Sequence, residues 1–282
     1  MEDTLRVGNL RCEHLSSPLG IEARQPRLSW ALESAVRGQR QSAYQVLVAS
    51  SPAQLAAGQA DLWDSGKVES DQSTYVPYAG AELGAGQRCW WQVRAWDKHG
   101  QPSDYSAPAS WELGLLDRAD WQAEWIGAPL AGGTYTTSPA PFLRTTFTLA
   151  ERPIASARLY ASALGVYEPH LNGAPVGDDV FAPGWTDYAI RAQYQVYDVT
   201  TMLRAGENVL GAILGDGWYA GYVGWEPRQR YGDQPKFLAQ LVVRYADGTS
   251  QTIASGAGWR VSFGPILESD MLMGESYDAR RE

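Results

Sequence analysis

The sequence predicts an all-β protein built as two antiparallel sandwiches, one after the other. Composition points this way, because 29 glycines, 16 prolines and 12 tryptophans accompany only 5 phenylalanines in 282 residues. Short runs of alternating large and small side chains recur between Gly, Pro, Asp and Ser clusters, which is typical of half-buried strands. No stretch keeps a helical period long enough for a helical domain. The length suits two domains, although one large domain is also compatible with it.

Residues 1–118 form the first predicted sandwich. Its strands are expected at Arg27–Leu32, Ala43–Ala49, Thr74–Tyr78 and Cys89–Trp96. In the second of these segments large side chains alternate with smaller or polar ones, the period of a strand with one buried face. Ser51 followed by Pro52 is typical of a helix start, so one helical turn is predicted within residues 51–59.

This segment resembles a fibronectin type III domain, which is an immunoglobulin-like sandwich. Trp30 lies where that fold keeps its core tryptophan, and residues 90–106 (WWQVRAWDKHGQPSDYS) resemble its penultimate strand, the turn and the start of the last strand. Trp30, Tyr44 and Trp91 are therefore predicted to pack in the core. Trp63 is predicted to lie against a neighbouring surface.

Residues 119–140 are predicted to form a linker that docks on the second domain. Trp121 and Trp125 lie in it with an acidic residue between them. Tryptophans exposed on a loose tether would forgo the free energy of burial, so a docked segment is favoured. The small and polar residues 131–140 predict a loop at its end.

Residues 141–282 are predicted to form a jelly-roll sandwich of the galactose-binding-like type. Alternating segments at 142–149, 157–164, 191–199, 207–214, 236–245 and 252–261 supply its expected strands. Asn172-Gly173 and Asp247-Gly248 predict tight hairpin turns. Many antiparallel strands with long end loops favour a jelly roll.

The stretch Leu210–Pro235 (LGAILGDGWYAGYVGWEPRQRYGDQP) concentrates glycines and aromatic residues between two of these strands. Loops of this length are usually functional or disordered, and disorder fits poorly with so many aromatic side chains. Aromatic faces pack against the apolar side of a sugar ring, while carboxylates accept hydrogen bonds from its hydroxyls. We therefore expect carbohydrate binding by Asp216, Trp218, Tyr219, Trp225, Tyr231 and Asp233.

Two alternatives stay open for this stretch. Trp218 and Tyr219 are equally compatible with packing the loop onto the sandwich. Asp216 is compatible with an Asx turn that shapes the sequence GDGW.

The charge balance argues against nucleic acid and an anionic membrane surface as partners. The formal net charge is −9, and an acidic chain without a basic run repels phosphate. No window approaches the roughly 20 apolar residues of a membrane span, and no secretory signal is evident, so a cytoplasmic protein is expected. Cys12 and Cys89 form no CxxC pair, so both are predicted to be reduced, with a single disulfide as the alternative.

Three runs together resemble the N-terminal region of bacterial α-L-rhamnosidases of glycoside hydrolase family 78. They are Tyr167–Tyr188 (YEPHLNGAPVGDDVFAPGWTDY), Gln193–Trp225 (QYQVYDVTTMLRAGENVLGAILGDGWYAGYVGW) and Gly274–Arg280 (GESYDAR). The order of domains agrees as well, since in that family a fibronectin-like domain precedes a jelly roll of this kind. The resemblance covers essentially the whole chain.

In that family the inverting hydrolysis of a terminal α-L-rhamnosyl bond is carried by acidic residues of an (α/α)6 barrel that follows these domains. The resemblance thus implies an accessory N-terminal region without catalytic residues, and the end of the chain at ARRE is expected to be a truncation. Inverting hydrolysis needs two carboxyl groups roughly 6.5–9.5 Å apart in a cleft. Glu268, Asp270 and Glu275 are close in sequence but are not expected to form such a pair.

In some members of the family the jelly roll binds rhamnose together with a calcium ion, so the resemblance implies a candidate metal site. Asp178 and Asp179 are adjacent in a loop, and calcium takes several hard oxygens from carboxylates and backbone carbonyls. Asp233 and a carbonyl near Pro235 would add ligands if the two loops meet at one end of the sandwich. The alternative is that the adjacent acids are simply solvated.

The expected partners are a rhamnosylated glycan or glycoside and the catalytic domain of the parent enzyme. The expected role is to brace that domain and to hold the glycan near its cleft. The alternative is a purely structural module that packs against the catalytic domain and has no ligand of its own. A self-sufficient hydrolase is a third reading, which the resemblance does not favour.

Overall fold

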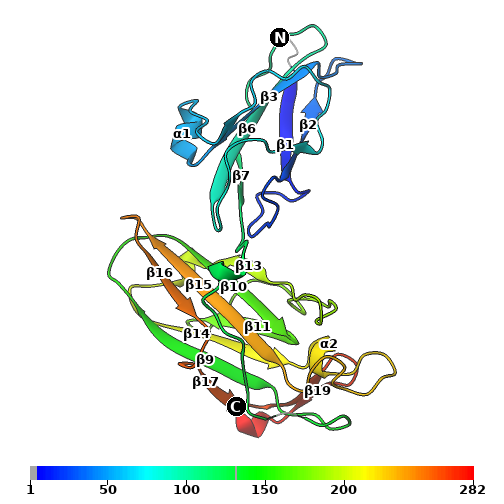
Figure 1. Ribbon diagram of the computed structural model, residues 1–282, viewed down its shortest axis with the longest axis vertical. Coiled ribbons are helices and arrows are strands. Elements are labelled where there is room, and N and C mark those ends of the chain that lie inside the picture. The colour runs from blue at the N-terminus through cyan, green and yellow to red at the C-terminus, as the bar shows by residue number, and fades with distance from the viewer. Residues whose placement is uncertain (1–4, 131) are drawn as a thin grey trace. The chain divides into compact units, whose positions relative to one another are not determined.

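The computed structural model describes residues 5–130 and 132–282 (Figure 1). The chain divides into two compact units at the boundary between Asp120 and Trp121. Both units consist mainly of antiparallel strands with short helical turns, so the predicted all-β class is confirmed. Among the described residues, no helix is long and apolar enough to span a membrane.

The first unit is an immunoglobulin-like sandwich. Its strands are β1 (Arg6–Cys12), β2 (Arg27–Glu33), β3 (Ala43–Ala49), β4 (Trp63–Asp64), β5 (Val76–Pro77), β6 (Arg88–Trp96) and β7 (Ala109–Glu112). They form a sheet of order β1-β2-β5 and a sheet of order β4-β3-β6-β7. Helix α1 (Pro52–Ala56) begins as predicted, because the Ser51 side chain accepts a hydrogen bond from the Gln54 N–H. A 3-10 turn, η1 (Arg118–Asp120), ends the unit.

The aromatic core of this sandwich is the one that the sequence predicted. Trp30, Tyr44 and Trp91 are buried in one hydrophobic cluster. Trp63 differs from its prediction, because it is half-buried against its own core and packs edge to face on Tyr78, with ring centroids 5.5 Å apart.

Cys12 and Cys89 lie in the same cluster as free thiols, so the predicted reduced state is confirmed and the disulfide alternative is wrong. Burial raises the pKa of both thiols, that of Cys89 to about 12, because an apolar environment disfavours the charged thiolate. Neither cysteine is therefore poised to react.

The second unit is a jelly-roll sandwich whose sheets enclose a hydrophobic core. One sheet has the order β13-β10-β15-β16, with β8 also paired to β15, and another has the order β12-β11-β14-β9-β17. The first contains β8 (Ile126–Gly127), β10 (Ile154–Leu164), β13 (Gln195–Asp198), β15 (Lys236–Tyr245) and β16 (Ser250–Ala254). The second contains β9 (Pro141–Leu149), β11 (Val166–Leu171), β12 (Ala174–Pro175), β14 (Gly206–Gly215) and β17 (Arg260–Phe263).

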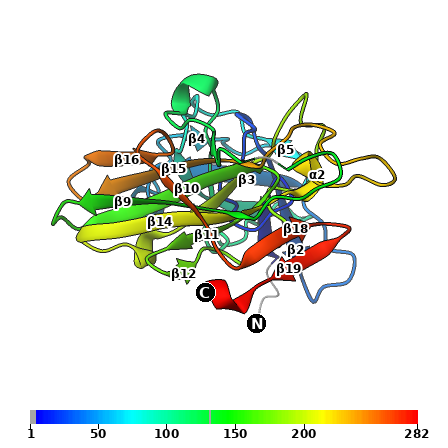
Figure 2. The ribbon, with the colours of Figure 1, turned by 90° about the horizontal axis from the view of Figure 1, so that it is seen from below.

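A separate hairpin completes this unit. It consists of β18 (Ile266–Asp270) and β19 (Gly274–Tyr277), coloured red in Figure 2. Helical turns are confined to η2 (Thr200–Met202), α2 (Gly217–Ala220) and η3 (Ala279–Arg281) within the described part of the unit.

Turn chemistry accounts for both predicted hairpins and for one wrong strand prediction. Asp247 and Gly248 join β15 to β16, and the Tyr245 N–H donates to the Thr249 carbonyl at 2.9 Å. Asn172 and Gly173 adopt φ of 54° and 87° and join β11 to β12 as the predicted hairpin, since this backbone suits the twist of the strands. The strand expected at 252–261 is wrong. Gly256 and Gly258 interrupt it, and the Trp259 N–H donates to the Gly256 carbonyl at 3.1 Å, so β16 and β17 lie in different sheets.

The segment after Asp120 packs on the second unit. The Trp121 ring lies edge to face with Tyr160 and Tyr194, with ring centroids 6.4 and 5.3 Å apart. The Gln122 N–H donates to Oε1 of Gln240 at 2.6 Å, and β8 then pairs with β15. This part of the chain is therefore held to the sheet by ring contacts and by strand pairing.

Candidate functional site

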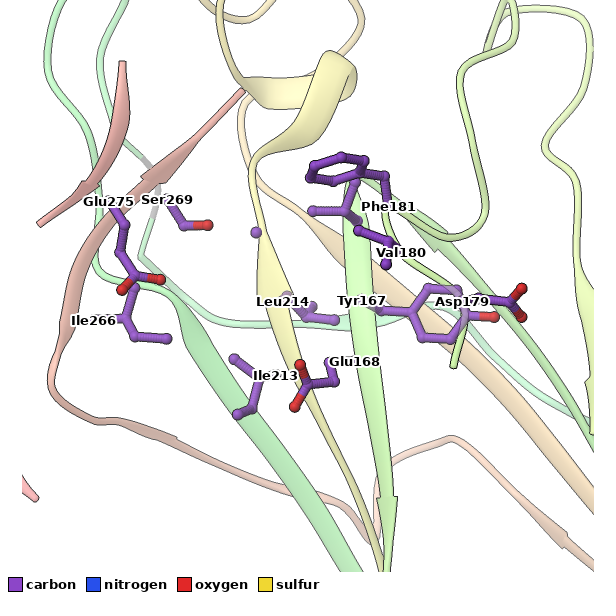
Figure 3. Close-up of a pocket in the computed structure, with 12 residues that line it drawn as sticks. Tyr167, Glu168, Asp179, Val180, Phe181, Ile213, Leu214, Ile266, Ser269 and Glu275 are labelled. Atoms are coloured by element: carbon purple, nitrogen blue, oxygen red, sulfur yellow. The ribbon is translucent and has the colours of Figure 1, made fainter. Parts of the chain in front are cut away.

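Two neighbouring cavities lie between the β11 and β14 ends, the loop after β12 and the β18–β19 hairpin. Their volumes are about 260 and 300 Å³, and both are lined by Val166, Phe181, Ser269 and Glu275. Together they form what we call the Phe181 groove, part of which is drawn in Figure 3.

Strand alternation builds the floor of this groove. Tyr167 and Leu214 pair directly across β11 and β14 and are buried in the core. Glu168 and Ile213 are the next pair and point to the opposite face, because successive side chains of a strand alternate. All four residues line the groove. At the end of β14, a Cβ on Gly215 would lie 2.8 Å from the Ser269 hydroxyl oxygen, so the close approach of β18 requires a glycine there.

An exposed aromatic ring forms the wall of the groove. Phe181 has a φ of 61° and leaves 56% of its surface exposed. Its loop is tied to the floor, because the Tyr167 N–H donates to the Ala182 carbonyl at 3.0 Å. Trp218 lies edge to face with Phe181 at 6.5 Å and stacks on Trp185, with centroids 6.0 Å apart and planes 6° from parallel.

Acidic side chains share the groove with this ring. Glu168 and Glu275 line it, and Figure 3 shows their carboxylates on the same side of Tyr167. The Glu168 Oε1 lies 2.6 Å from Nε2 of His170. Among the described residues that line the two cavities, none is a lysine or an arginine. The groove therefore offers hydrogen-bond acceptors beside an apolar ring.

The structure separates the four aromatic residues among the six predicted carbohydrate-binding residues into three settings. Trp218 lines neither cavity of the groove, but its ring packs on Phe181, which does. Tyr219 and Tyr231 pack edge to face on Tyr188, with centroids 5.3 and 5.2 Å apart, so these rings hold the loop to itself. Trp225 is fully exposed at the far end of the loop.

The two predicted acids of this loop lie in opposite environments. Asp233 is exposed and near Tyr219, whose pKa is raised by burial and then by the Asp233 charge. Asp216 is buried and accepts a hydrogen bond from Nη2 of Arg228. Its carboxylate faces this guanidinium inside the protein. Because the side chain is buried, its exposure gives no support to a direct contact with a sugar, and that contact stays a prediction.

Asp216 belongs instead to the network that fixes the loop. Arg228 also donates to the carbonyls of Gly133 and Thr136, and its Nε lies 4.0 Å from Oδ2 of Asp270. Asp270 in turn accepts hydrogen bonds from backbone N–H groups of the β18–β19 turn. One buried cation thus joins α2, the segment before β9 and the hairpin that borders the groove.

The predicted calcium ligands do not gather into one cluster. Asp178 and Asp179 are exposed in the loop after β12. Burial raises the pKa of Tyr197, and the nearby carboxylate of Asp179 adds to this effect. Among the described residues, no group of three or more His, Cys, Asp or Glu is placed to hold a metal ion. Asp233 therefore does not complete an acidic site with them, and Pro235 is buried beside β8.

Sequence reasoning missed the residues that line most of the groove. The sequence pattern assigns neither Phe181 nor Glu168 to a binding site, and it presents Glu275 only as an acid near two others. Trp185, which stacks on Trp218, is likewise not predicted. The sequence signal that could identify the wall of the groove is the run VFAPGW, in which two aromatic residues follow an acidic pair. Both rings are exposed in the structure.

The comparisons with known proteins agree with the fold. Residues 152–282 match the family described as alpha-L-rhamnosidase N-terminal domain, and residues 7–117 match the family described as Rha78A-like, N-terminal immunoglobulin domain. An α-L-rhamnosidase of Streptomyces avermitilis is 34% identical, over 99% of this chain and 43% of its own length. One of Formosa agariphila is 39% identical, over 96% of this chain and 30% of its own length.

Solved structures give the same result. The crystal structure of the Streptomyces avermitilis α-L-rhamnosidase complexed with L-rhamnose has a TM-score of 0.96 at 33% identity, covering 99% of this chain and 43% of that chain. The α-L-rhamnosidase from Dictyoglumus thermophilum has a TM-score of 0.88 at 36% identity, covering 98% and 32%. This chain thus spans less than half the length of these relatives. The chain thus carries the two N-terminal domains of α-L-rhamnosidases, a Rha78A-like immunoglobulin domain over residues 7–117 and the alpha-L-rhamnosidase N-terminal domain over residues 152–282.

Proposed function

We propose that the second unit binds an L-rhamnosyl group of a glycan or glycoside in the Phe181 groove. The observation that carries this proposal is an exposed Phe181 ring in the same groove as the carboxylates of Glu168 and Glu275. A deoxysugar presents an apolar face with a methyl group, which suits the ring, and hydroxyls, which donate to carboxylates. A polar rim around an apolar wall is typical of small-molecule sites.

The proposed role lies within a larger enzyme. The family likeness supports a parent protein that hydrolyses terminal α-L-rhamnosyl bonds with inversion, using a catalytic barrel outside this chain. Binding in the Phe181 groove would keep a rhamnosylated substrate close to that barrel, which raises its effective concentration there. The catalytic domain is accordingly the proposed protein partner.

The proposal includes a calcium site, but with fewer ligands than the sequence predicted, because Asp233 does not join Asp178 and Asp179. Asp178 and Asp179 bring two hard carboxylates, whereas calcium takes about six to eight oxygens. Backbone carbonyls and water would have to supply the others, so these two residues alone do not make a complete site. The proposed calcium site therefore rests only on the two adjacent carboxylates of Asp178 and Asp179.

Calorimetry with L-rhamnose tests the sugar proposal. We expect saturable binding to the chain, loss of binding in Phe181→Ala, and affinity at least tenfold weaker in Glu275→Gln, because each removes one partner of the sugar. The matched control is Glu151→Gln, which makes the same change at an exposed position. A titration with calcium chloride and then with a chelator tests whether Asp178→Asn and Asp179→Asn alter an added metal-binding step.

A structural module is the second candidate, and the fully exposed Trp225 favours it. Tryptophan is enriched in the contact surfaces between proteins, where a partner covers its ring. Two results together would favour a structural module over a sugar-binding domain. They are no heat on titration with L-rhamnose, and weaker association of Trp225→Ala with the separately produced catalytic domain. Turnover of a chromogenic rhamnoside by this chain alone would contradict both candidates.

A further inference from the structure

Two arginines lie directly opposite each other on the outer face of the second unit. Arg144 of β9 and Arg260 of β17 are partners in the antiparallel register, and both side chains are exposed. Leu143, next to Arg144, is buried, so the strand alternation sends Arg144 outward. Directly opposed side chains have Cβ atoms only about 4.5–5.5 Å apart.

Two opposed positive charges destabilise the sheet, and no ion pair within the described residues offsets this repulsion. Within residues 5–130 and 132–282, neither Arg144 nor Arg260 has an ion pair or a side-chain hydrogen bond. Like charges directly opposite in a sheet are destabilising. The chain carries a net charge of −9, so acidic side chains are plentiful, yet none in the described part of the chain forms an ion pair with either arginine.

The pair also lines a cavity of its own. Its volume is about 130 Å³, and its lining consists of Arg144, Thr145, Thr146, Gly258 and Arg260. A Cβ on Gly258 would meet nothing within 4 Å, so the turn before β17 leaves the cavity open. The cavity shares no residue with the Phe181 groove.

We propose that the Arg144–Arg260 cavity binds a doubly charged tetrahedral oxyanion, sulfate or phosphate, free or carried on a saccharide. Two guanidinium groups supply planar sets of N–H donors that match such oxygens, and the hydroxyl of Thr146, which lies on the same face of β9 as Arg144, adds a donor. A charge of −2 offsets both arginines, whereas a single carboxylate would leave one charge uncompensated. The inference is independent of rhamnose binding, because it concerns a separate cavity.

Calorimetry of the whole chain with sodium sulfate and sodium phosphate, at an ionic strength held constant with sodium chloride, tests the proposal. We expect saturable binding that Arg144→Gln and Arg260→Gln each weaken by at least tenfold, the loss typical of a hydrogen-bonded charge. The control is Arg152→Gln, which removes the same charge from an exposed ion pair with Asp247 and should bind as the wild type does.

A second titration distinguishes the sources of the oxyanion. L-Rhamnose 3-sulfate that binds more tightly than inorganic sulfate supports a sulfated saccharide as ligand, and equal affinities support a free oxyanion. The proposal is overturned if neither compound shows saturable binding, or if Arg152→Gln weakens binding as much as the two cavity variants. Neutral L-rhamnose, measured on the same variants, reports the Phe181 groove separately.

Discussion

Arg228 and Asp216 form an ion pair inside the second unit, with only 1% and 4% of their side chains exposed. Asp270 lies on the other side of the same guanidinium, so one buried cation is shared by two carboxylates. Because removing water from charged groups is costly, such a pair specifies the position of the loop more than it adds stability. This loop carries Trp218, whose ring packs on Phe181 at the wall of the groove.

Asp216 makes the stability of this unit depend on pH. Burial raises the pKa of its carboxyl to about 6, and Arg228 offsets only part of that rise. A solvated aspartate in the unfolded chain has a pKa of about 4. Since the folded value is the higher one, the stability contributed by this group is fully present below about pH 4 and is lost as the pH rises through about 6.

The Asp216→Asn variant removes this titration. We expect the free energy of unfolding of the wild type, relative to that of the variant, to fall by roughly 2 to 3 kcal/mol between pH 4 and pH 7. Urea denaturation at several pH values measures it, with the exposed Asp71→Asn as control. A relative stability that rises over this range would mean that the attraction of Arg228 outweighs burial.

Trp218 and Trp225 should differ in their effect on sugar binding, although both lie in the same loop. Trp218 supports the Phe181 ring at the wall of the groove, whereas Trp225 is fully exposed and has no ring partner among the described residues. We expect Trp218→Ala to weaken L-rhamnose binding by about tenfold, since an aromatic contact is worth roughly 0.5–1.5 kcal/mol. Trp225→Ala should leave the affinity unchanged, and the reverse order would place the sugar at the loop tip.

The sequence predicted strands wherever alternation and turn residues agreed. The β3 segment Ala43–Ala49 and the β15 segment Lys236–Tyr245 have the expected bounds, because a period of two over seven or more residues admits no helical alternative. The run 252–261 failed because its two glycines divide strands of different sheets. The predicted single buried face of Ala43–Ala49 is also wrong, because all seven residues are buried. Periodicity carries no information on the sheet that a strand joins or on what packs against its second face.

The candidate site was less predictable than the fold, for a physical reason. Aromatic and acidic residues mark a binding surface only if they are exposed, and exposure depends on partners distant in sequence. Asp216 is buried in an ion pair with Arg228, and the Tyr231 ring packs against the Tyr188 ring. Glu275 reaches the groove because β19 pairs with β18 beside β14, a contact that no local pattern announces.

The two buried cysteines should resist modification in the folded chain. Both thiols are buried and the pKa of Cys89 is raised to about 12, so the thiolate is scarce even at pH 9. We expect no reaction with a disulfide reagent at pH 7 or pH 9, and reaction of 2 thiols per chain after denaturation. The control Ala35→Cys, at an exposed position, should react at once, and rapid reaction of the native cysteines would show that the first sandwich opens readily.

Gly177 and Gly173 allow steric clash to be separated from backbone strain. Both have positive φ, 74° and 87°, so alanine is strained at either position. A Cβ on Gly177 would lie 2.6 Å from Cε1 of Tyr197, whereas a Cβ on Gly173 would meet nothing within 4 Å. Gly173→Ala should therefore cost about 1 kcal/mol of unfolding free energy from strain alone, and Gly177→Ala should cost more, roughly 2 to 4 kcal/mol, because the loop or the Tyr197 ring has to move.

The position of Gly177 connects this difference to function. The residue directly precedes Asp178 and lies four residues before Phe181, so a shifted backbone displaces the aromatic wall of the groove. Gly177→Ala should weaken L-rhamnose binding as well as lower the midpoint of urea denaturation, while Gly173→Ala should affect the denaturation midpoint only. Equal losses of affinity in both variants would indicate that lower stability alone weakens binding. The loop after β12 would then have no specific role in sugar binding.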